Sequence, residues 1–278
     1  MIKKLPIKKR VIFSLTAVLA ILTPLLIWDN IRLETVHYEI KAKNIPEAFE
    51  GFKILQVSDL HNNLFGENQH RLIEAIKKEN PDMIAITGDL IDSEKTDNSY
   101  MFIKEAVKIA PCYYVNGNHE KWTGMYESQI KPALEGYGVN VLDDETAYII
   151  RGEERLPIFG LSDYAEGWHI AFLVMHGRFK EDGFAVVLSH RPEHFEVYAD
   201  LNVPLVLTGH AHGGQFRIPF THQGLYAPNQ GVFPKYTEGV YRKNNTQMVV
   251  SRGLGNNVWP IPRVNNCYQL VSITLYKE

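Results

Sequence analysis

Cysteine is scarce in this chain, and its two copies stand far apart. Among 278 residues, only Cys112 and Cys267 are cysteines. Neither belongs to a CxxC pair, which argues against a structural zinc knot and against a disulfide-rich scaffold. A disulfide between them requires that the domain lies outside the cytoplasm. Two buried free thiols are the simpler expectation.

Basic side chains are also scarce outside the first ten residues. Those ten carry five positive charges and no acidic residue: Lys3, Lys4, Lys8, Lys9 and Arg10. The rest of the chain carries 24 Lys and Arg against 32 Asp and Glu, a net charge of −8. A body of this composition lacks the clustered basic face of a nucleic-acid-binding protein and disfavours an exonuclease. An acidic site would instead suit cations.

Charge is absent altogether from residues 11–28, which read VIFSLTAVLAILTPLLIW. A transmembrane helix needs roughly 20 mostly apolar residues, so this run is just long enough. The positive charges precede it, and the positive-inside rule then places residues 1–10 in the cytoplasm and the body outside. We therefore predict a single-pass anchor in the cell membrane and an extracytoplasmic body.

Two alternatives to an uncleaved anchor remain at this point. A cleaved signal peptide has the same charged and apolar regions, but no small-x-small cleavage site follows the run. The buried first helix of a cytoplasmic protein would show polar residues every turn, which this run does not. The expected divisions are a basic N-terminus (1–10), an anchor (11–28), a stalk with an opening strand (29–49) and one domain (50–278).

The body shows no internal repeat and no low-complexity tract, and its first half alternates strand and helix patterns. Strands are expected at Lys53–Ser58, Met83–Thr87 and Cys112–Val115, with helices at Glu67–Asn80 and Asn98–Ile109 between them. This order predicts a parallel sheet with right-handed crossovers. Further helices are expected at Thr123–Glu135, Trp168–Met175 and Pro192–Ala199, and further strands at Val139–Leu142, Ala147–Ile150, Leu156–Gly160, Ala185–Ser189, Leu205–Thr208, Gln247–Ser251 and Tyr268–Tyr276. The mixture predicts an α/β fold of two sheets packed face to face, with helices outside.

Five short polar motifs each follow an apolar strand. In chain order they are Asp59-Leu60-His61, Gly88-Asp89, Gly117-Asn118-His119-Glu120, His190 and Gly209-His210-Ala211-His212. Strand ends in α/β sheets are where ligands gather, and alternate residues of a strand point the same way. The carboxylate, amide and imidazole groups, with no thiolate among them, suit Mn²⁺, Fe or Zn²⁺. Each motif alone is weak, but five in this arrangement rarely arise by chance.

In this order, the motifs resemble those of the calcineurin-like metallophosphoesterase superfamily. The likeness covers about residues 50–276, and the sequences SDLH, TGDL, GNHE, LSHRP and TGHAHGGQ resemble its membrane-associated bacterial branch. That branch includes YaeI- and YkuE-like phosphodiesterases and UDP-diacylglucosamine pyrophosphatases of the lipid A pathway. The resemblance implies the four-layer metallo-dependent phosphatase fold, in which helices flank a sandwich of two mixed sheets.

The resemblance also implies a role for each motif. The implied ligands are Asp59, His61 and His212 for one divalent cation, Asn118, His190 and His210 for a second, and Asp89 for both. A water that bridges two cations loses its proton near neutral pH and can attack phosphorus. His119 matches the catalytic histidine of the family, which donates a proton to the leaving oxygen or stabilises the phosphoryl charge.

Four other acidic residues lie near the motifs. Glu120 is a candidate to support the ligands from behind. For Asp92, Asp143 and Asp144, we expect solvated loop charges instead.

The function implied is hydrolysis of a phosphoester, either a phosphodiester or a pyrophosphate, by a metal-bridging hydroxide. The substrate expected near a membrane anchor is a lipid or another cell-envelope component. One alternative is a UDP-2,3-diacylglucosamine-type lipid pyrophosphatase, although an extracytoplasmic body would lie away from nucleotide precursors. Another is a non-catalytic binding scaffold, which is disfavoured because every ligand position is filled.

Overall fold

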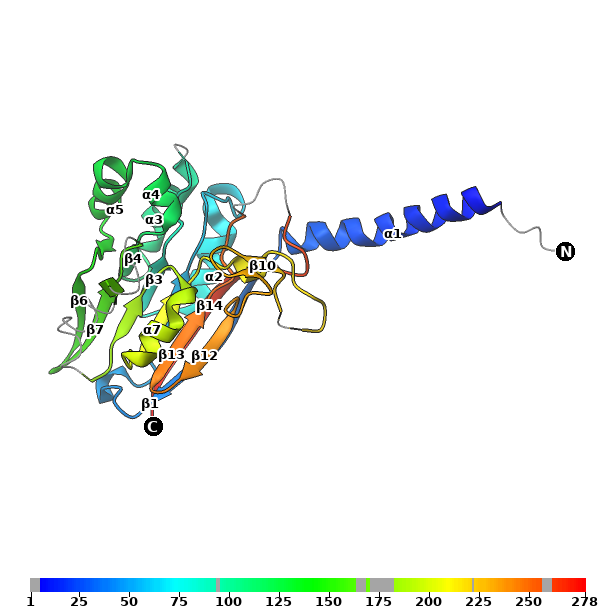
Figure 1. Cartoon of the computed structure of the whole chain (residues 1–278). Helices are drawn as coiled ribbons and strands as arrows, with labels where there is room; N and C mark the ends of the chain where they lie inside the picture. The colour runs from blue at the N-terminus through cyan, green and yellow to red at the C-terminus, as the bar shows by residue number, and fades with distance from the viewer. Residues whose placement is uncertain (1–5, 94–95, 164–168, 171–182, 222, 257–261) are drawn as a thin grey trace.

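The computed structural model describes residues 6–93, 96–163, 169–170, 183–221, 223–256 and 262–278. Within them, one long helix projects from a body of two sheets and shorter helices (Figure 1). The α-helices are α1 (Ile7–Asp29), α2 (His70–Glu79), α3 (Asp97–Ala106), α4 (Asn118–Trp122), α5 (Lys131–Gly136) and α7 (Phe195–Asp200). The expected helix Trp168–Met175 lies almost wholly outside the described residues.

The first sheet has six strands in the order β1-β14-β2-β3-β4-β5. Their bounds are Leu33–Ala42, Tyr268–Lys277, Lys53–Val57, Met83–Thr87, Cys112–Val115 and Asn140–Val141. Strands β2, β3 and β4 are parallel, as predicted, and β5 adds a further parallel strand, whereas β14 runs antiparallel to β2. The segment expected to form a stalk with an opening strand contains β1, which pairs with β14 along its whole length.

The second sheet also has six strands, in the order β12-β13-β9-β8-β7-β6. Their bounds are Gly239–Lys243, Thr246–Val250, Leu205–Thr208, Val186–Leu188, Glu154–Gly160 and Thr146–Arg151. The central strands are parallel and both edge strands are antiparallel. A small hairpin of β10 (Tyr226–Ala227) and β11 (Gly231–Val232) lies apart from both sheets.

Three apolar cores hold these layers together, and strand alternation decides which core a side chain joins. On β3, for example, Met83 and Ala85 pack between the two sheets, while Ile84 and Ile86 pack under the helices α2, α3 and α5. A third core lies between the second sheet and α7. The predicted sandwich of two mixed sheets flanked by helices is therefore confirmed.

The prediction of a transmembrane helix over residues 11–28 is wrong for the described part of the chain. Among the described residues, no helix is long and apolar enough to cross a membrane. The run lies in α1, whose described side chains include the less apolar Ser14, Thr16 and Pro24.

Both cysteines are buried and free. Cys112 lies on β4, and Cys267 directly precedes β14. Burial raises the pKa of the Cys112 thiol to about 12, so this group stays protonated at neutral pH. Two buried free thiols, the simpler of the two expectations, are what the structure contains.

Candidate metal centre

The five motifs lie just beyond the carboxyl ends of β2, β3, β4, β8 and β9. These strand ends, from both sheets, lie at one edge of the sandwich. Five of the seven predicted ligands have a left-handed backbone, with φ between 46° and 64°: Asp59, His61, Asp89, His210 and His212. Residues other than glycine adopt this conformation rarely, and such strain concentrates at functional sites.

The backbone at Asp59 and His61 differs from the strand geometry predicted there. We expected Asp59 and His61 to point together because alternate strand residues share a side, but β2 ends at Val57. Both residues instead lie in a tight left-handed turn whose N–H groups bond to Gly88 and Asp89 carbonyls. Turn geometry, and not strand alternation, brings the two side chains together.

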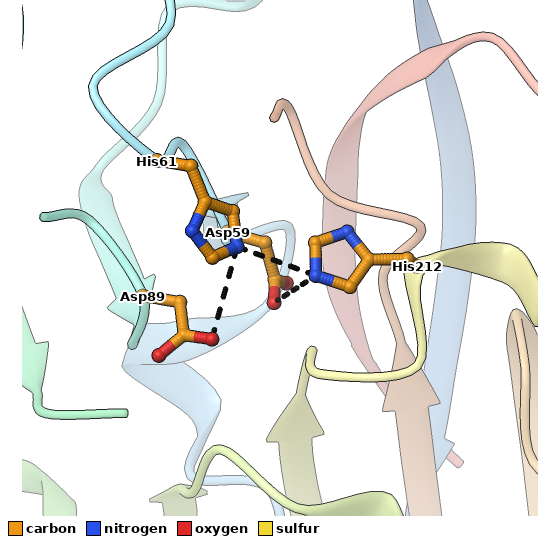
Figure 2. A group of neighbouring side chains, drawn as sticks. All are labelled: Asp59, His61, Asp89 and His212. Carbon is orange, nitrogen blue, oxygen red and sulfur yellow. Dashed lines mark hydrogen bonds and ion pairs between the residues drawn. The ribbon is translucent and has the colours of Figure 1, made fainter. Parts of the chain in front are cut away.

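The first cluster comprises four buried side chains, shown in Figure 2: Asp59, His61, Asp89 and His212. One donor atom from each lies within 4.8 Å of all the others. His61 Nε2 is 3.3 Å from His212 Nε2, which in turn is 3.5 Å from Asp59 Oδ1. His61 Nε2 is 3.8 Å from Asp89 Oδ2. The four side chains thus converge on one small volume.

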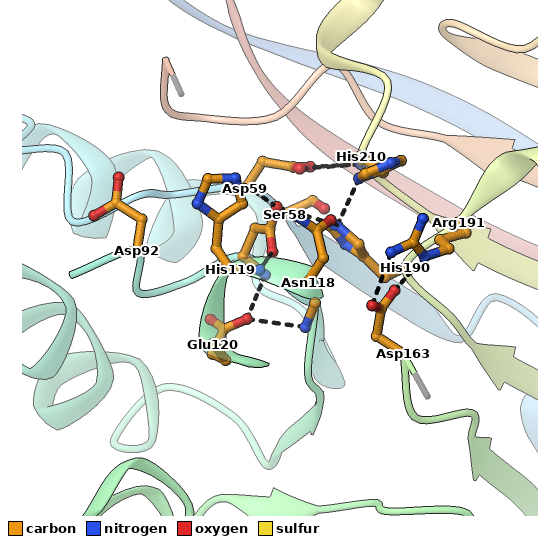
Figure 3. Close-up of polar contacts among 12 residues, drawn as sticks. Ser58, Asp59, Asp92, Asn118, His119, Glu120, Asp163, His190, Arg191 and His210 are labelled. Carbon is orange, nitrogen blue, oxygen red and sulfur yellow. Dashed lines mark hydrogen bonds and ion pairs between the residues drawn. The ribbon is translucent and has the colours of Figure 1, made fainter. Parts of the chain in front are cut away.

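The second cluster comprises Asp89, His190 and His210, whose donor atoms also lie within 4.8 Å of one another. His190 Nε2 is 3.1 Å from Asp89 Oδ2 and 3.0 Å from His210 Nδ1. Asn118 adds an amide oxygen 3.2 Å from the same His190 nitrogen, as Figure 3 shows. Asp89 therefore belongs to both clusters, the position of a bridging ligand.

The chemistry of these groups fits two divalent cations. Carboxylates and imidazoles crowded at 3.0–3.8 Å in a buried place are costly unless a positive charge offsets them. Their oxygen and nitrogen donors match the preferences of first-row transition metals. Six of the seven predicted ligands lie in the two clusters, and Asn118 lies beside the second.

Electrostatics at the site centre on Asp89. Burial would raise the pKa of this carboxyl, but the facing His190 holds it well below its usual range. Burial would likewise lower the pKa of His190, and the charge of Asp89 outweighs this and raises that pKa to about 10. Burial, reinforced by repulsion from His190, lowers the pKa of the adjacent His210 to about 3. The pKa values of these neighbouring imidazoles thus differ because the charge of Asp89 dominates at His190, whereas burial dominates at His210.

His119 lies at the open side of the site, in the first turn of α4. Its side chain is 15% exposed, against 3% or less for His61, His190 and His212. Its Nε2 is 4.0 Å from Asp89 Oδ2, and burial lowers its pKa. With His61 and Asp92 it also forms a third group of candidate donors, which shares His61 with the first cluster. Of these imidazoles, that of His119 is best placed to meet a substrate.

Glu120 supports the site from behind, as predicted. Its carboxylate is fully buried and accepts backbone N–H groups from Asp89, Ile91 and Gly117 at 2.8–3.0 Å. Burial, followed by repulsion from Asp89, raises its pKa to about 7. Two motif loops are thereby tied to a single side chain.

The other acidic residues differ from expectation in part. Asp92 Oδ2 lies 3.6 Å from His61 Nδ1, where it can orient that ring, so it is more than a solvated loop charge. Asp143 instead accepts hydrogen bonds from Tyr126 and Lys131. Asp144 accepts from Ser162. The last two hold loops together away from the ligands.

Two arginines beside the ligands were not predicted from the sequence. Arg263 is fully buried, and its Nη2 lies 3.2 Å from His212 Nδ1. Arg191 forms a two-point ion pair with Asp163, at 2.6 and 3.0 Å, directly after His190 (Figure 3). The motif LSHRP contains Arg191 and could have signalled it, whereas nothing in the sequence near Arg263 marks it.

Because the backbone packs closely around Gly209, a single methyl group added there is expected to destabilise the protein strongly. An alanine Cβ at position 209 would overlap Ser58 Oγ and Asp59 Oδ2, well inside the 3.0 Å that real Cβ contacts require. Gly209→Ala is expected to lower the free energy of unfolding by about 2–3 kcal/mol, as overpacking does. Urea unfolding measures this value.

The matched control is Gly136→Ala at the end of α5, where an added Cβ meets nothing within 4 Å. That variant should be neutral or gain up to ~1 kcal/mol, because alanine favours a helix over glycine. Equal effects of the two substitutions would contradict the packing around Gly209.

Comparison with known proteins gives the family. The model of the calcineurin-like phosphoesterase family matches residues 52–214, which hold all five motifs. The chain belongs to the calcineurin-like phosphoesterase family. It is 32% identical over 238 residues to the uncharacterised metallophosphoesterase YkuE of Bacillus subtilis, covering 82% of this chain and 81% of that protein. Together, the family and the two buried clusters indicate a phosphoester hydrolase with a dinuclear metal site.

Two further likenesses concern one relative and one solved structure. The phosphodiesterase YaeI of Escherichia coli is 26% identical over 212 residues, covering 74% of this chain and 76% of YaeI. Among solved structures, the sulfate thiohydrolase SoxB of Thermus thermophilus aligns with a TM-score of 0.50 at 14% identity, over 84% of this chain and 57% of SoxB. The latter likeness concerns the fold alone.

Proposed function

We propose that this calcineurin-like phosphoesterase hydrolyses a phosphodiester or pyrophosphate bond with two cations drawn from Mn²⁺, Fe and Zn²⁺. The observation that carries this proposal is the sharing of Asp89 between two buried clusters that hold six of the seven predicted ligands, with Asn118 beside the second. Support for a diester comes from the likeness to YaeI, a phosphodiesterase. Loss of ligands would favour a binding scaffold, but each ligand position is filled.

Cations held by these side chains would polarise the phosphoryl oxygens and acidify a water near neutral pH. Hydrolysis would join a water oxygen to phosphorus and break the bond between phosphorus and the leaving oxygen, with the proton of the attacking water passing to solvent. His119 Nε2, on the open side of the site, then gives its proton to the leaving oxygen. The Asp92 carboxylate, 3.6 Å from His61 Nδ1, would help to orient that ring, and Glu120 fixes the loop of Asp89.

A substrate panel with Mn²⁺ supplied tests this proposal. It compares bis(p-nitrophenyl) phosphate, p-nitrophenyl phosphate, a cyclic nucleotide and a nucleotide sugar at equal concentration. We expect turnover of the diester or the pyrophosphate to exceed that of the monoester and to require added cations. Faster turnover of the monoester would contradict the diester assignment, and no turnover of any member would contradict hydrolysis itself.

A further inference from the structure

A cavity adjoins the first metal cluster. It has a volume of about 660 Å³ and is lined by His61 and, at the C-terminal end of α1, by Leu26 and Ile27. Leu64, Pro262 and Tyr268 complete its apolar lining. The lining of the cavity thus combines a proposed metal ligand with apolar side chains.

The lining of this cavity carries little charge. Among the described residues that form it, none is Lys, Arg, Asp or Glu. A site for a second phosphate or another anion would need basic side chains or free N–H groups. The cavity therefore suits an uncharged group attached to the phosphorus at the metal centre.

Several side chains of the lining are asparagines, and their amides are largely committed to the protein itself. Asn30 donates to the Leu26 and Arg263 carbonyls and accepts from the Arg263 N–H. Asn63 donates to the Leu254 carbonyl and accepts from the N–H of the next residue. Because these amides already have partners, the apolar side chains are the main surface that remains for a ligand.

The apolar wall is held in place and is accessible. The two hydrogen bonds between Asn30 and Arg263 join the end of α1 to the chain segment before β14, and Figure 1 shows the helix meeting the body there. Arg71 adds a bond to the Ile31 carbonyl. Ile27 is 56% exposed and Leu64 is 49% exposed, so each presents carbon to the cavity and to solvent. Covering such surface is favourable.

We propose that this cavity binds an alkyl chain of the substrate, so that the enzyme prefers amphipathic phosphoesters with an uncharged apolar substituent. The inference rests on the proposed hydrolysis, because it places the substrate's phosphorus at the two clusters. It adds the chemical class of the substituent, which the ligand set alone does not specify.

A homologous series of p-nitrophenyl alkyl phosphates tests the inference on the full chain with Mn²⁺. The alkyl group runs from methyl to hexyl, below the concentration at which the esters form micelles. We expect kcat/KM to rise by about two- to fourfold per methylene, the range for partial to full burial of each carbon. Hydrolysis of the methyl ester with a flat or falling series would overturn the alkyl site while leaving the proposed function intact. Absence of methyl-ester hydrolysis would instead count against the function.

Variants of the exposed wall locate the effect. Ile27→Ser combined with Leu64→Ser is expected to reduce the hexyl-to-methyl ratio of kcat/KM by at least about fivefold, because the chain then covers polar surface. The matched control is Ile150→Ser, since Ile150 is 71% exposed on β6 and away from the cavity lining. An equal fall of the ratio in the control, or an unchanged ratio in the double variant, would overturn the assignment. A preference for a charged substituent, such as a nucleoside phosphate over hexyl, would do the same.

Discussion

Asp89→Asn is expected to lower kcat/KM for bis(p-nitrophenyl) phosphate by about 10³-fold or more. The substitution keeps the size of the side chain but removes the negative charge shared by both clusters. Two like-charged cations would then lack the carboxylate that both clusters share, and several kcal/mol of charge stabilisation correspond to a factor of this size. Steady-state kinetics with Mn²⁺ and metal analysis of the same preparation measure the two effects, and bound metal should fall together with activity.

The control for this substitution is Asp200→Asn. Asp200 ends α7, its side chain is 70% exposed, and its contact is with Lys243. Removal of that charge should leave kinetics and metal content unchanged, because exposed ion pairs contribute little. Wild-type activity in Asp89→Asn would refute the shared-ligand role.

His119→Ala should lower turnover without removing metal, and by an amount that depends on the leaving group. General acid catalysis contributes typically 10²–10⁴-fold, so an alkoxide leaving group should slow by about that factor. A p-nitrophenolate leaves without help from a proton and should slow by only about tenfold. The side chain lies 4.0 Å from Asp89 at the open side of the site, which suits proton donation and does not require it as a ligand.

Metal content separates the two roles that geometry offers His119. As a proton donor its loss leaves both cations bound, whereas as a ligand of the third group, with His61 and Asp92, its loss removes metal. His37→Ala serves as control, because His37 is a surface histidine of β1 paired with Glu79. Equal slowing of both leaving groups, together with lost metal, would contradict the proton-donor role.

Much of the fold followed from local patterns. The strands Met83–Thr87, Cys112–Val115 and Leu205–Thr208 were predicted with the bounds that the structure shows. Each is a short apolar run that ends in a polar motif, and burial on both faces makes such strands easy to recognise. The polar side chains at their ends were identified for the same reason.

Features that depend on contacts between distant segments could not be predicted from local sequence patterns. A strand was expected within residues 29–49, but its partner β14 lies more than 200 residues away in the sequence, so no local pattern indicated which sheet it joins. The left-handed turns at Asp59 and His61 are imposed by hydrogen bonds to the Gly88 and Asp89 carbonyls, which no local propensity encodes. The cavity beside His61 likewise needs α1 and the segment before β14 together.

The bounds of the helix that begins at residue 118 also depend on tertiary contacts and could not be predicted from local patterns. A helix was expected over Thr123–Glu135, but α4 begins at Asn118 and α5 at Lys131, with a π-helical turn over Tyr126–Ile130 between them. Glu120 ties the start of α4 to the Asp89 loop through its buried carboxylate. Tertiary contacts of one side chain thus set where the helix begins.

The metal content of the purified chain, measured with its activity, tests the central claim most directly. Elemental analysis should find up to two transition-metal ions per chain. Chelation should remove both the ions and the hydrolysis of bis(p-nitrophenyl) phosphate, and added Mn²⁺ should restore activity. Full activity in protein stripped of metal, or protein that binds no cation when Mn²⁺ is supplied, would contradict the dinuclear site built around Asp89.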